Sequence, residues 1–228
     1  MKGYILHFES AITRAVGRFG AELAPQSRVL DAGAGEGQYA HYFAGHRYVG
    51  VDLGVGDAAW DYGGLSAVAD LLALPFPDGT FDGVLNVVTL EHVTDPPGVV
   101  RELARVLAAG GRLLLIVPHE WEVHQHPHDY FRYTRFGCQL LLKGAGLRID
   151  SIRPVGGYFR LLSRRLLSGY KFFPAPLSWL WLAVVALPAL LLPWLDGLDR
   201  QADYTLGYIC HAHKDAESGY ADGYAETP

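Results

Sequence analysis

The sequence predicts an α/β fold: a seven-stranded, mostly parallel sheet with an antiparallel last strand and helices on both faces. Residues 29–37, Val-Leu-Asp-Ala-Gly-Ala-Gly-Glu-Gly, have the pattern of a buried strand followed by a glycine-rich turn. A second strand is predicted at residues 47–52 and ends in an acid, Asp52. Apolar segments of strand length then alternate with segments of helical periodicity, which favours a parallel sheet covered by helices.

Each element follows from its local pattern. Apolar residues recur at helical spacing over residues 8–23 and predict a helix that covers the sheet. We expect another helix to begin near Glu36, directly after the glycine turn. The remaining strands are predicted at residues 67–76, 81–93 (with the turn that follows), 110–118, 147–155 and 205–213, the last antiparallel to the strand before it. Further helices are predicted at residues 96–107 and at 134–145, where Thr134 is the N-cap and Gly146 ends the helix.

The glycine turn has the composition of a nucleoside-binding site. A strand, a tight turn and a helix N-terminus bring backbone N–H groups close to a ligand. A carboxylate at Asp52 suits the two hydroxyls of a ribose. The glycines at 33, 35 and 37 do not have the spacing of the dinucleotide-binding fingerprint. Asp31, in the turn itself, would repel a pyrophosphate but suits the ammonium group of an amino acid.

These motifs resemble those of the class I S-adenosylmethionine-dependent methyltransferases. The segment around Asp70 is similar to that family's third-strand segment, whose acid takes the adenine amino group, and residues 81–93 resemble its fourth strand. The order and spacing are similar to the methyltransferase domain called type 11, over residues 26–153. The resemblance implies a Rossmann-like fold, methyltransferase activity and S-adenosylmethionine as cofactor. It implies a cofactor site made of Asp31, Ala32, Gly33, Gly35, Asp52, Leu53, Asp70, Leu71 and Asn86.

Candidate catalytic residues lie where the acceptor should bind, at the ends of the fourth and fifth strands. His92 is either a general base or a structural residue, and its neighbour Glu91 is expected to be structural or to lie on the cofactor side. The loop at 118–133 is rich in histidine and aromatic residues and is predicted to be a polar lid. Its spacing fits no standard zinc pattern, so we expect no metal. The candidates for catalysis are His92, His119, His128, Asp129 and Tyr130.

About 45 residues separate the sixth and seventh strands, far more than a hairpin needs. Residues 158–171 are basic, and residues 172–195 carry no charge. One membrane crossing would leave the seventh strand on the wrong side, and Pro188 is expected to interrupt a helix. A bent hairpin that dips into a membrane, with its arginines on anionic headgroups, is one interpretation. A buried cap or a homodimer contact is the other.

Composition limits the remaining possibilities. The net charge of −5 excludes a general nucleic-acid footprint. Two distant cysteines and no expected signal peptide indicate a cytoplasmic protein, peripheral at most on the inner membrane face. We expect a methyltransferase domain at 1–157 and 204–213, the insertion at 158–203 and a disordered tail at 214–228. The expected acceptor is a small or amphipathic molecule, such as a glycan, a lipid-linked compound, or a quinone-like or polyketide-like compound. The alternatives are an NAD- or nucleotide-sugar-dependent Rossmann enzyme and a non-catalytic, membrane-associated module that binds adenosylmethionine.

Overall fold

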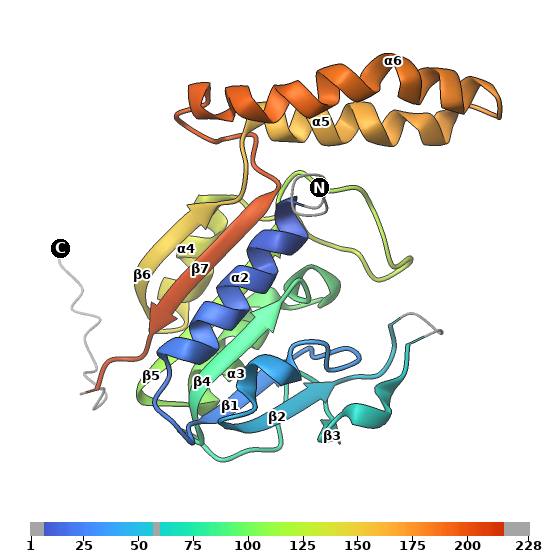
Figure 1. Cartoon of the computed structure of the whole chain (residues 1–228). Helices are drawn as coiled ribbons and strands as arrows, with labels where there is room; N and C mark the ends of the chain where they lie inside the picture. Colours follow the sequence, from blue (N-terminus) through green and yellow to red (C-terminus); the bar gives the residue numbers. More distant parts are fainter. Residues whose placement is uncertain (1–6, 57–59, 217–228) are drawn as a thin grey trace, which may run out of the picture.

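The computed structural model describes residues 7–56 and 60–216. The expected tail lies outside the described residues from position 217 onward. Seven strands form one sheet in the order β3-β2-β1-β4-β5-β7-β6 (Figure 1). The strands are β1 Arg28–Ala32, β2 Arg47–Asp52, β3 Ala67–Val68, β4 Phe81–Val87, β5 Leu107–Pro118, β6 Arg148–Pro154 and β7 Gly207–His213.

The predicted fold class is confirmed. Strands β1 to β5 pair in parallel, and β7 lies antiparallel between β5 and β6. The carboxyl ends of β1, β2, β4 and β5 therefore meet at one edge of the sheet. Ligands of open α/β sheets bind at this edge.

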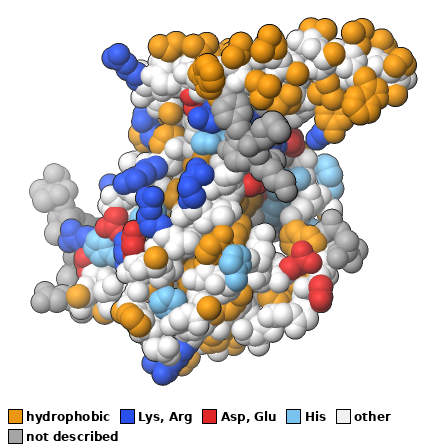
Figure 2. All heavy atoms as spheres, in the orientation of Figure 1, with side chains coloured by type: hydrophobic (Ala, Val, Ile, Leu, Met, Phe, Trp, Pro, Cys, Tyr) orange, Lys and Arg blue, Asp and Glu red, His pale blue; other side chains and the backbone are white. Residues whose placement is uncertain are grey.

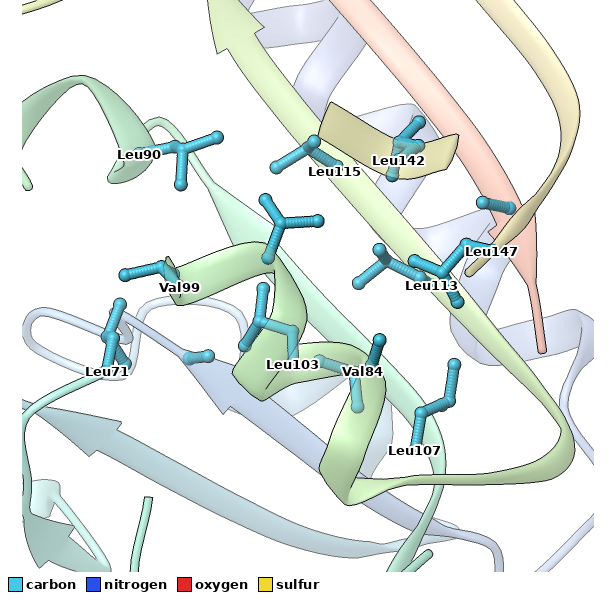
Figure 3. Close-up of a cluster of buried hydrophobic side chains, with 14 of the residues drawn as sticks. Leu71, Val84, Leu90, Val99, Leu103, Leu107, Leu113, Leu115, Leu142 and Leu147 are labelled. Atoms are coloured by element: carbon cyan, nitrogen blue, oxygen red, sulfur yellow. The ribbon is translucent and has the colours of Figure 1, made fainter. Parts of the chain in front are cut away.

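Helices cover both faces of the sheet, as predicted. The helix α2 (His7–Glu22) covers one face and buries Phe8, Val16 and Phe19. The helices α3 (Pro96–Val106) and α4 (Arg135–Gly144) cover the other face (Figure 1). Figure 3 shows the buried hydrophobic cluster on this face, in which leucines and valines of α3 and α4 meet those of β4 and β5. The Thr134 hydroxyl accepts a hydrogen bond from Gly137 N–H at 3.1 Å, so the predicted N-cap of α4 is confirmed.

The helix expected near Glu36 is absent. Turns follow the glycines, and only a short 3₁₀ helix, η1 (Ala40–Phe43), precedes β2. Gly33, Gly35 and Gly37 all have positive φ angles, of 86°, 53° and 74°. A right-handed helix cannot include residues in this conformation, so the backbone keeps turning until the glycines end. The prediction was wrong because Gly37, directly after Glu36, still belongs to the turn.

The long insertion forms a helical hairpin. It consists of α5 (Tyr158–Ser168), the 3₁₀ helix η4 (Gly169–Phe172), α6 (Leu177–Leu191) and the 3₁₀ helix η5 (Leu192–Leu198). Pro188 lies inside α6 and does not end it, which corrects the sequence prediction. Val185 and Ala189 are buried on either side of this proline, and Ser163 Oγ of α5 donates a hydrogen bond to Ala189 O at 2.5 Å. The Ala189 carbonyl would otherwise lack a helical donor, because residue 193 is also a proline, so α5 satisfies it.

The hairpin lies beyond the end of β6, at the same sheet edge as the expected site (Figure 1). Its arginines were expected to face anionic headgroups, but they have protein partners. Arg160 Nε lies 3.0 Å from Asp196 Oδ2, and Arg164 lies 2.7 Å from Glu122 of the lid. The Arg164 guanidinium also lies 3.6 Å from the centre of the Trp121 ring. Arg160 thus joins two helices of the hairpin, and Arg164 holds the hairpin to the lid.

Candidate functional site

The glycine turn is folded back onto β2 and packed against the end of β4. The N–H groups of Gly33 and Ala34 both donate to Val51 O, at 2.8 and 3.0 Å. Thr89 Oγ1 donates to Gly33 O at 3.2 Å. A Cβ atom at position 33 would overlap with the Thr89 side chain. Glycine is therefore required here by both its φ angle and the close approach of Thr89.

Asp52 is held beside this turn in a fixed orientation. Its Oδ2 accepts a hydrogen bond from Gly35 N–H at 3.0 Å, and its Oδ1 accepts one from Gly54 N–H at 2.9 Å. Each carboxylate oxygen can accept more than one hydrogen bond. The remaining lone pairs suit vicinal hydroxyls such as those of a ribose. The next residue, Leu53, is 49 % exposed and offers an apolar surface at the same end of β2.

Asp31 is fully buried at the end of β1. Tyr48 O–H donates a hydrogen bond to its Oδ2 at 2.8 Å, while Oδ1 is buried without a partner among the described residues. Burial raises the pKa of Asp31 to about 7; the Tyr48 hydrogen bond lowers this pKa, and the charge of Asp52 raises it. An unpaired carboxylate oxygen beside a glycine turn fits the ammonium group of an amino-acid moiety, directly or through water.

The other predicted cofactor residues differ in how they can act. Asp70 is exposed, and its Oδ1 accepts a hydrogen bond from Leu72 N–H at 2.9 Å. Leu71 and Ala32 are buried in the core. Asn86 is also fully buried and donates to Ala32 O at 2.7 Å. Asn86 is therefore placed to hold the end of β1 beside β4, and its Oδ1 has no partner among the described residues.

Sequence reasoning missed a group of residues that lies next to the glycine turn. The ring of Trp60 would lie 3.4 Å from a Cβ atom at Gly35. Glu36 Oε1 accepts a hydrogen bond from Asp61 N–H at 3.0 Å, and Tyr62 O–H accepts one from Gly56 N–H at 2.8 Å. These contacts place Trp60 and Tyr62, here called the aromatic flap, beside the glycine turn. The run Trp-Asp-Tyr shortly after Asp52 was the available signal, because aromatic residues in a polar loop next to a nucleoside site suggest stacking.

A second group of polar residues lies where β4 ends. Glu91 and His92 belong to a 3₁₀ turn, η3 (Leu90–His92), and His124 belongs to the lid. Glu91 Oε1 lies 3.7 Å from His92 Nε2 and 4.0 Å from His124 Nε2. The Glu91 side chain is fully buried, and neither carboxylate oxygen has a hydrogen-bond partner among the described residues. Burial raises the pKa of Glu91 to about 8.

His92 is oriented by the lid. Its Nδ1 lies 2.6 Å from His128 O, so Nδ1–H donates to this carbonyl and Nε2 carries the free lone pair. Burial lowers the pKa of His92, which keeps the ring neutral. A neutral imidazole with a free Nε2 can accept a proton from an acceptor hydroxyl or an activated C–H. Both interpretations made from the sequence, structural residue and general base, remain compatible with this geometry.

A half-buried ion pair between Asp129 and Arg132 fixes the middle of the lid. Asp129 Oδ1 lies 2.6 Å from Arg132 Nη1, and its Oδ2 also accepts hydrogen bonds from Arg132 Nη2 and His124 N–H, both at 2.8 Å. The Arg132 hydrogen bonds hold the pKa of Asp129 well below its usual range. Its carboxylate thus has a full set of protein partners. Asp129 is thus engaged in contacts within the protein, and its role on the acceptor stays a prediction.

The other predicted lid residues are divided between two places. His128 Nδ1 lies 2.8 Å from Tyr130 Oη, and both residues are exposed at the surface of the lid. His119 is directed elsewhere: its ring lies 5.8 Å from that of Tyr208, and its Nδ1 is buried without a partner among the described residues. The histidines of the lid are thus not brought together, and only His124 joins the group around Glu91.

Comparisons with known proteins agree with this geometry. Residues 30–115 match the family model described as a methyltransferase domain. The chain is 38 % identical over 155 residues to the ubiquinone/menaquinone biosynthesis C-methyltransferase UbiE of Cellvibrio japonicus, covering 59 % of this chain and 60 % of that protein. It is 38 % identical over 109 residues to a probable tocopherol O-methyltransferase of Oryza sativa, covering 42 % of this chain and 30 % of that protein. The chain spans less than two thirds of the length of either relative.

A solved structure shows the same fold. The Burkholderia thailandensis 1,6-didemethyltoxoflavin-N1-methyltransferase, with bound 1,6-didemethyltoxoflavin and S-adenosylhomocysteine, superimposes with a TM-score of 0.56. The alignment covers 89 % of this chain and 77 % of that one at 20 % sequence identity. Asp52 and the unpaired oxygen of Asp31 supply carboxylate acceptors that fit the ribose hydroxyls and the ammonium group of S-adenosylmethionine, whereas the N–H groups of Gly33, Ala34 and Gly35 are already bonded within the protein. Residues 30–115 therefore carry a methyltransferase domain of the class I, S-adenosylmethionine-dependent type.

Proposed function

We propose that this protein transfers the methyl group of S-adenosylmethionine to an amphipathic acceptor that it takes from a membrane surface. The observation that supports the acceptor class is the apolar hairpin beside the lid. The chemistry itself asks little of the protein. An in-line nucleophile displaces the sulfonium leaving group, so the main task is to hold the nucleophile and the methyl carbon close and collinear.

The apolar surface of the hairpin is the first argument for a membrane-dissolved acceptor. The segment Leu177–Leu198 has 22 residues and contains an 18-residue window with a mean hydropathy of 1.9, of which only 17 % is buried. A helix that is apolar on all sides is normally covered by protein or lipid. Figure 2 shows hydrophobic side chains over the visible length of the hairpin. Exposed aromatic residues lie at both ends of the segment: Trp179 is 71 % exposed and Trp194 is 78 % exposed.

The topology favours a hairpin that lies in the membrane surface over one that crosses the membrane. Both ends of the insertion join strands of the same sheet, β6 and β7. The charged face of α5 contacts the body of the protein, while α6 supplies the apolar face. Together the two helices form one amphipathic unit, which is suited to partial insertion among lipid headgroups. Because the arginines of α5 have protein partners, apolar contacts should dominate the binding.

The hairpin is also connected to the candidate acceptor site. Arg164 and Arg165 both contact Glu122 of the lid, at 2.7 and 3.4 Å. Two residues further along, the lid supplies His124 to the group around Glu91. An acceptor that leaves the membrane at α6 would therefore meet the lid next. The compounds in the names of two relatives, ubiquinone/menaquinone and tocopherol, belong to the same amphipathic class.

A transfer assay tests this function directly. The full-length protein would be incubated with S-adenosylmethionine that carries a labelled methyl group and with vesicles containing quinols or chromanols. We expect label in the organic extract with the wild-type protein, and less label with Asp52→Ala at a cofactor concentration that does not saturate the variant. If S-adenosylhomocysteine binds normally but no acceptor in a broad panel is methylated, the catalytic proposal is wrong and a non-catalytic binding module remains.

Vesicle binding tests the membrane part separately. We expect the protein to co-sediment with both neutral and anionic vesicles, with a weak dependence on salt. Trp179→Ser together with Trp194→Ser should release it without changing its affinity for S-adenosylhomocysteine. Trp181 is unsuitable for this test because its Nε1–H donates to Leu166 O at 2.8 Å inside the hairpin. A protein that ignores vesicles and is a dimer in solution would contradict the proposed contact.

A further inference from the structure

We propose that Glu91, His92 and His124 form a binding site for one divalent transition-metal ion, with Zn²⁺ as the reference ion. The ligand atoms of these three residues lie within 4.8 Å of one another. This site was not expected from the sequence, because Glu91 and His92 lie more than thirty positions before His124. The folded lid brings them together.

The first argument is that three acceptor atoms converge without a donor. His92 Nδ1 is used by His128 O at 2.6 Å, which leaves the lone pair of Nε2 facing Glu91. His124 Nδ1 lies 3.1 Å from Glu122 O and 3.3 Å from Asp129 Oδ2, which leaves its Nε2 free as well. Glu91 supplies a carboxylate that is fully buried and has no hydrogen-bond partner among the described residues. A cation is the natural complement of such a group.

The second argument is that the separations fit metal ligands better than a shared proton. A proton on Glu91 would need an acceptor within about 3 Å. The two imidazole nitrogens instead lie 3.7 and 4.0 Å from Glu91 Oε1. Ligand bonds of about 2.0–2.1 Å place two tetrahedral ligands roughly 3.4 Å apart, so small side-chain rotations would complete the site.

The third argument is the support behind the ligands. Metal-bound histidines usually donate their other ring N–H to a carboxylate or a backbone carbonyl, which fixes the tautomer and the ring orientation. Both histidines here have that arrangement. Asp129, which orients His124, is itself held by Arg132. The rings of His92 and His124 lie 4.9 Å apart at 82°, so their nitrogens can point to a common centre.

The ligand set indicates the class of ion and what it would do. Two imidazoles and one carboxylate suit Zn²⁺ and other borderline first-row ions better than Ca²⁺ or Mg²⁺. Three protein ligands leave at least one position for water or for an oxygen atom of the acceptor. A bound ion would also join the lid to η3. It would occupy His92 Nε2, so His92 would then orient the acceptor through the metal.

Metal titration of the full-length, chelator-treated protein tests the proposal without any activity assay. With Zn²⁺ as the probe, we expect one ion per chain. His124→Ala should weaken binding by at least about 100-fold. The matched control is His126→Ala, which removes an exposed histidine of the same lid and should change the affinity less than about twofold. Equal binding by both variants, or no stoichiometric binding by the wild-type protein, would overturn the site.

A spectroscopic measurement on the wild-type protein does not depend on any variant folding correctly. With Cu²⁺ as the probe, pulsed electron paramagnetic resonance counts coordinated imidazoles through their remote nitrogens. We expect two imidazoles per ion in the wild-type protein and one in His124→Ala. Fewer than two in the wild-type protein would contradict the proposed ligand set. Because these readouts concern the metal alone, the result is independent of whether the methyl-transfer proposal holds.

Discussion

Replacing Asp31 by asparagine should change how the stability of the protein depends on pH. Burial raises the pKa of Asp31 from 3.8 to about 7 in the folded state. Between these two values the folded state holds a proton that the unfolded state has released. The free energy of unfolding must therefore fall as the pH rises through this window. Asparagine has no charge to bury and should not show this loss.

The size of the effect follows from the shift in pKa. Each pKa unit corresponds to about 1.4 kcal/mol, so a shift of about three units corresponds to roughly 4 kcal/mol as an upper value. Relative to the wild-type protein, Asp31→Asn should thus gain stability from pH 4 to pH 8. Below pH 4 the two proteins should differ little in their pH dependence. Above about pH 8 the difference should become constant.

Urea denaturation at several pH values, without cofactor, measures this difference. Asp82→Asn is a suitable control because Asp82 is an exposed carboxylate on β4 and accepts a hydrogen bond from Arg28 N–H at 2.8 Å. Parallel curves for the wild-type protein and Asp31→Asn would refute the reasoning. Saturating S-adenosylhomocysteine should reduce the pH dependence of the wild-type protein, because its ammonium group would stabilise the ionised form of Asp31.

Three other changes test separate parts of the site. Asp52→Ala should weaken the binding of S-adenosylhomocysteine by about 5- to 150-fold in calorimetry, since losing a paired acceptor costs about 1–3 kcal/mol. An unchanged affinity in the folded variant would remove Asp52 from the site. His92→Ala should lower turnover at saturating cofactor and leave cofactor affinity near the wild-type value if His92 acts on the acceptor. If the melting temperature, the turnover and the cofactor affinity of His92→Ala all fall, the role of His92 is structural. Trp60→Ala should weaken the binding of S-adenosylhomocysteine without lowering the melting temperature. An unchanged affinity would exclude the aromatic flap from the site.

Much of the fold could be predicted because its signals are local. The segment Arg47–Asp52 is short, has apolar residues at its centre and ends in an acid, and the observed strand has these same bounds. Thr134 and Gly146 have the residue types of a helix cap and a helix stop, and α4 lies between them. The helix expected after the glycine turn failed for an equally local reason. Three positive φ angles cannot be recognised from glycine spacing alone, because glycine allows either sign of φ.

The candidate site was predicted only where its residues are neighbours in the sequence. The strand ends that carry Asp31 and Asp52 are set by local pattern, so these residues could be placed before the fold was known. The orientation of the Asn86 side chain could not be predicted, because its hydrogen bond to Ala32 O depends on the pairing of β1 with β4. Trp60 was missed because the loop that carries it has no periodicity. Its position depends on contacts with the turn it covers.

The lid shows most clearly why residue type alone does not identify a site. Its histidines suggest a metal site made from the loop itself, yet the loop directs them to different partners: His119 to Tyr208, His128 to Tyr130, and His124 to Glu91. The position of His124 depends on Asp129. The Asp129 carboxylate accepts a hydrogen bond from His124 N–H and is held by Arg132. Arg132 Nη2 in turn donates to Glu122 O at 2.9 Å, and the Glu122 side chain binds Arg164 of the hairpin. One chain of contacts thus joins the apolar hairpin to the ligands around Glu91. A shift of the hairpin at a membrane surface would be transmitted to His124 through charged groups that are already paired.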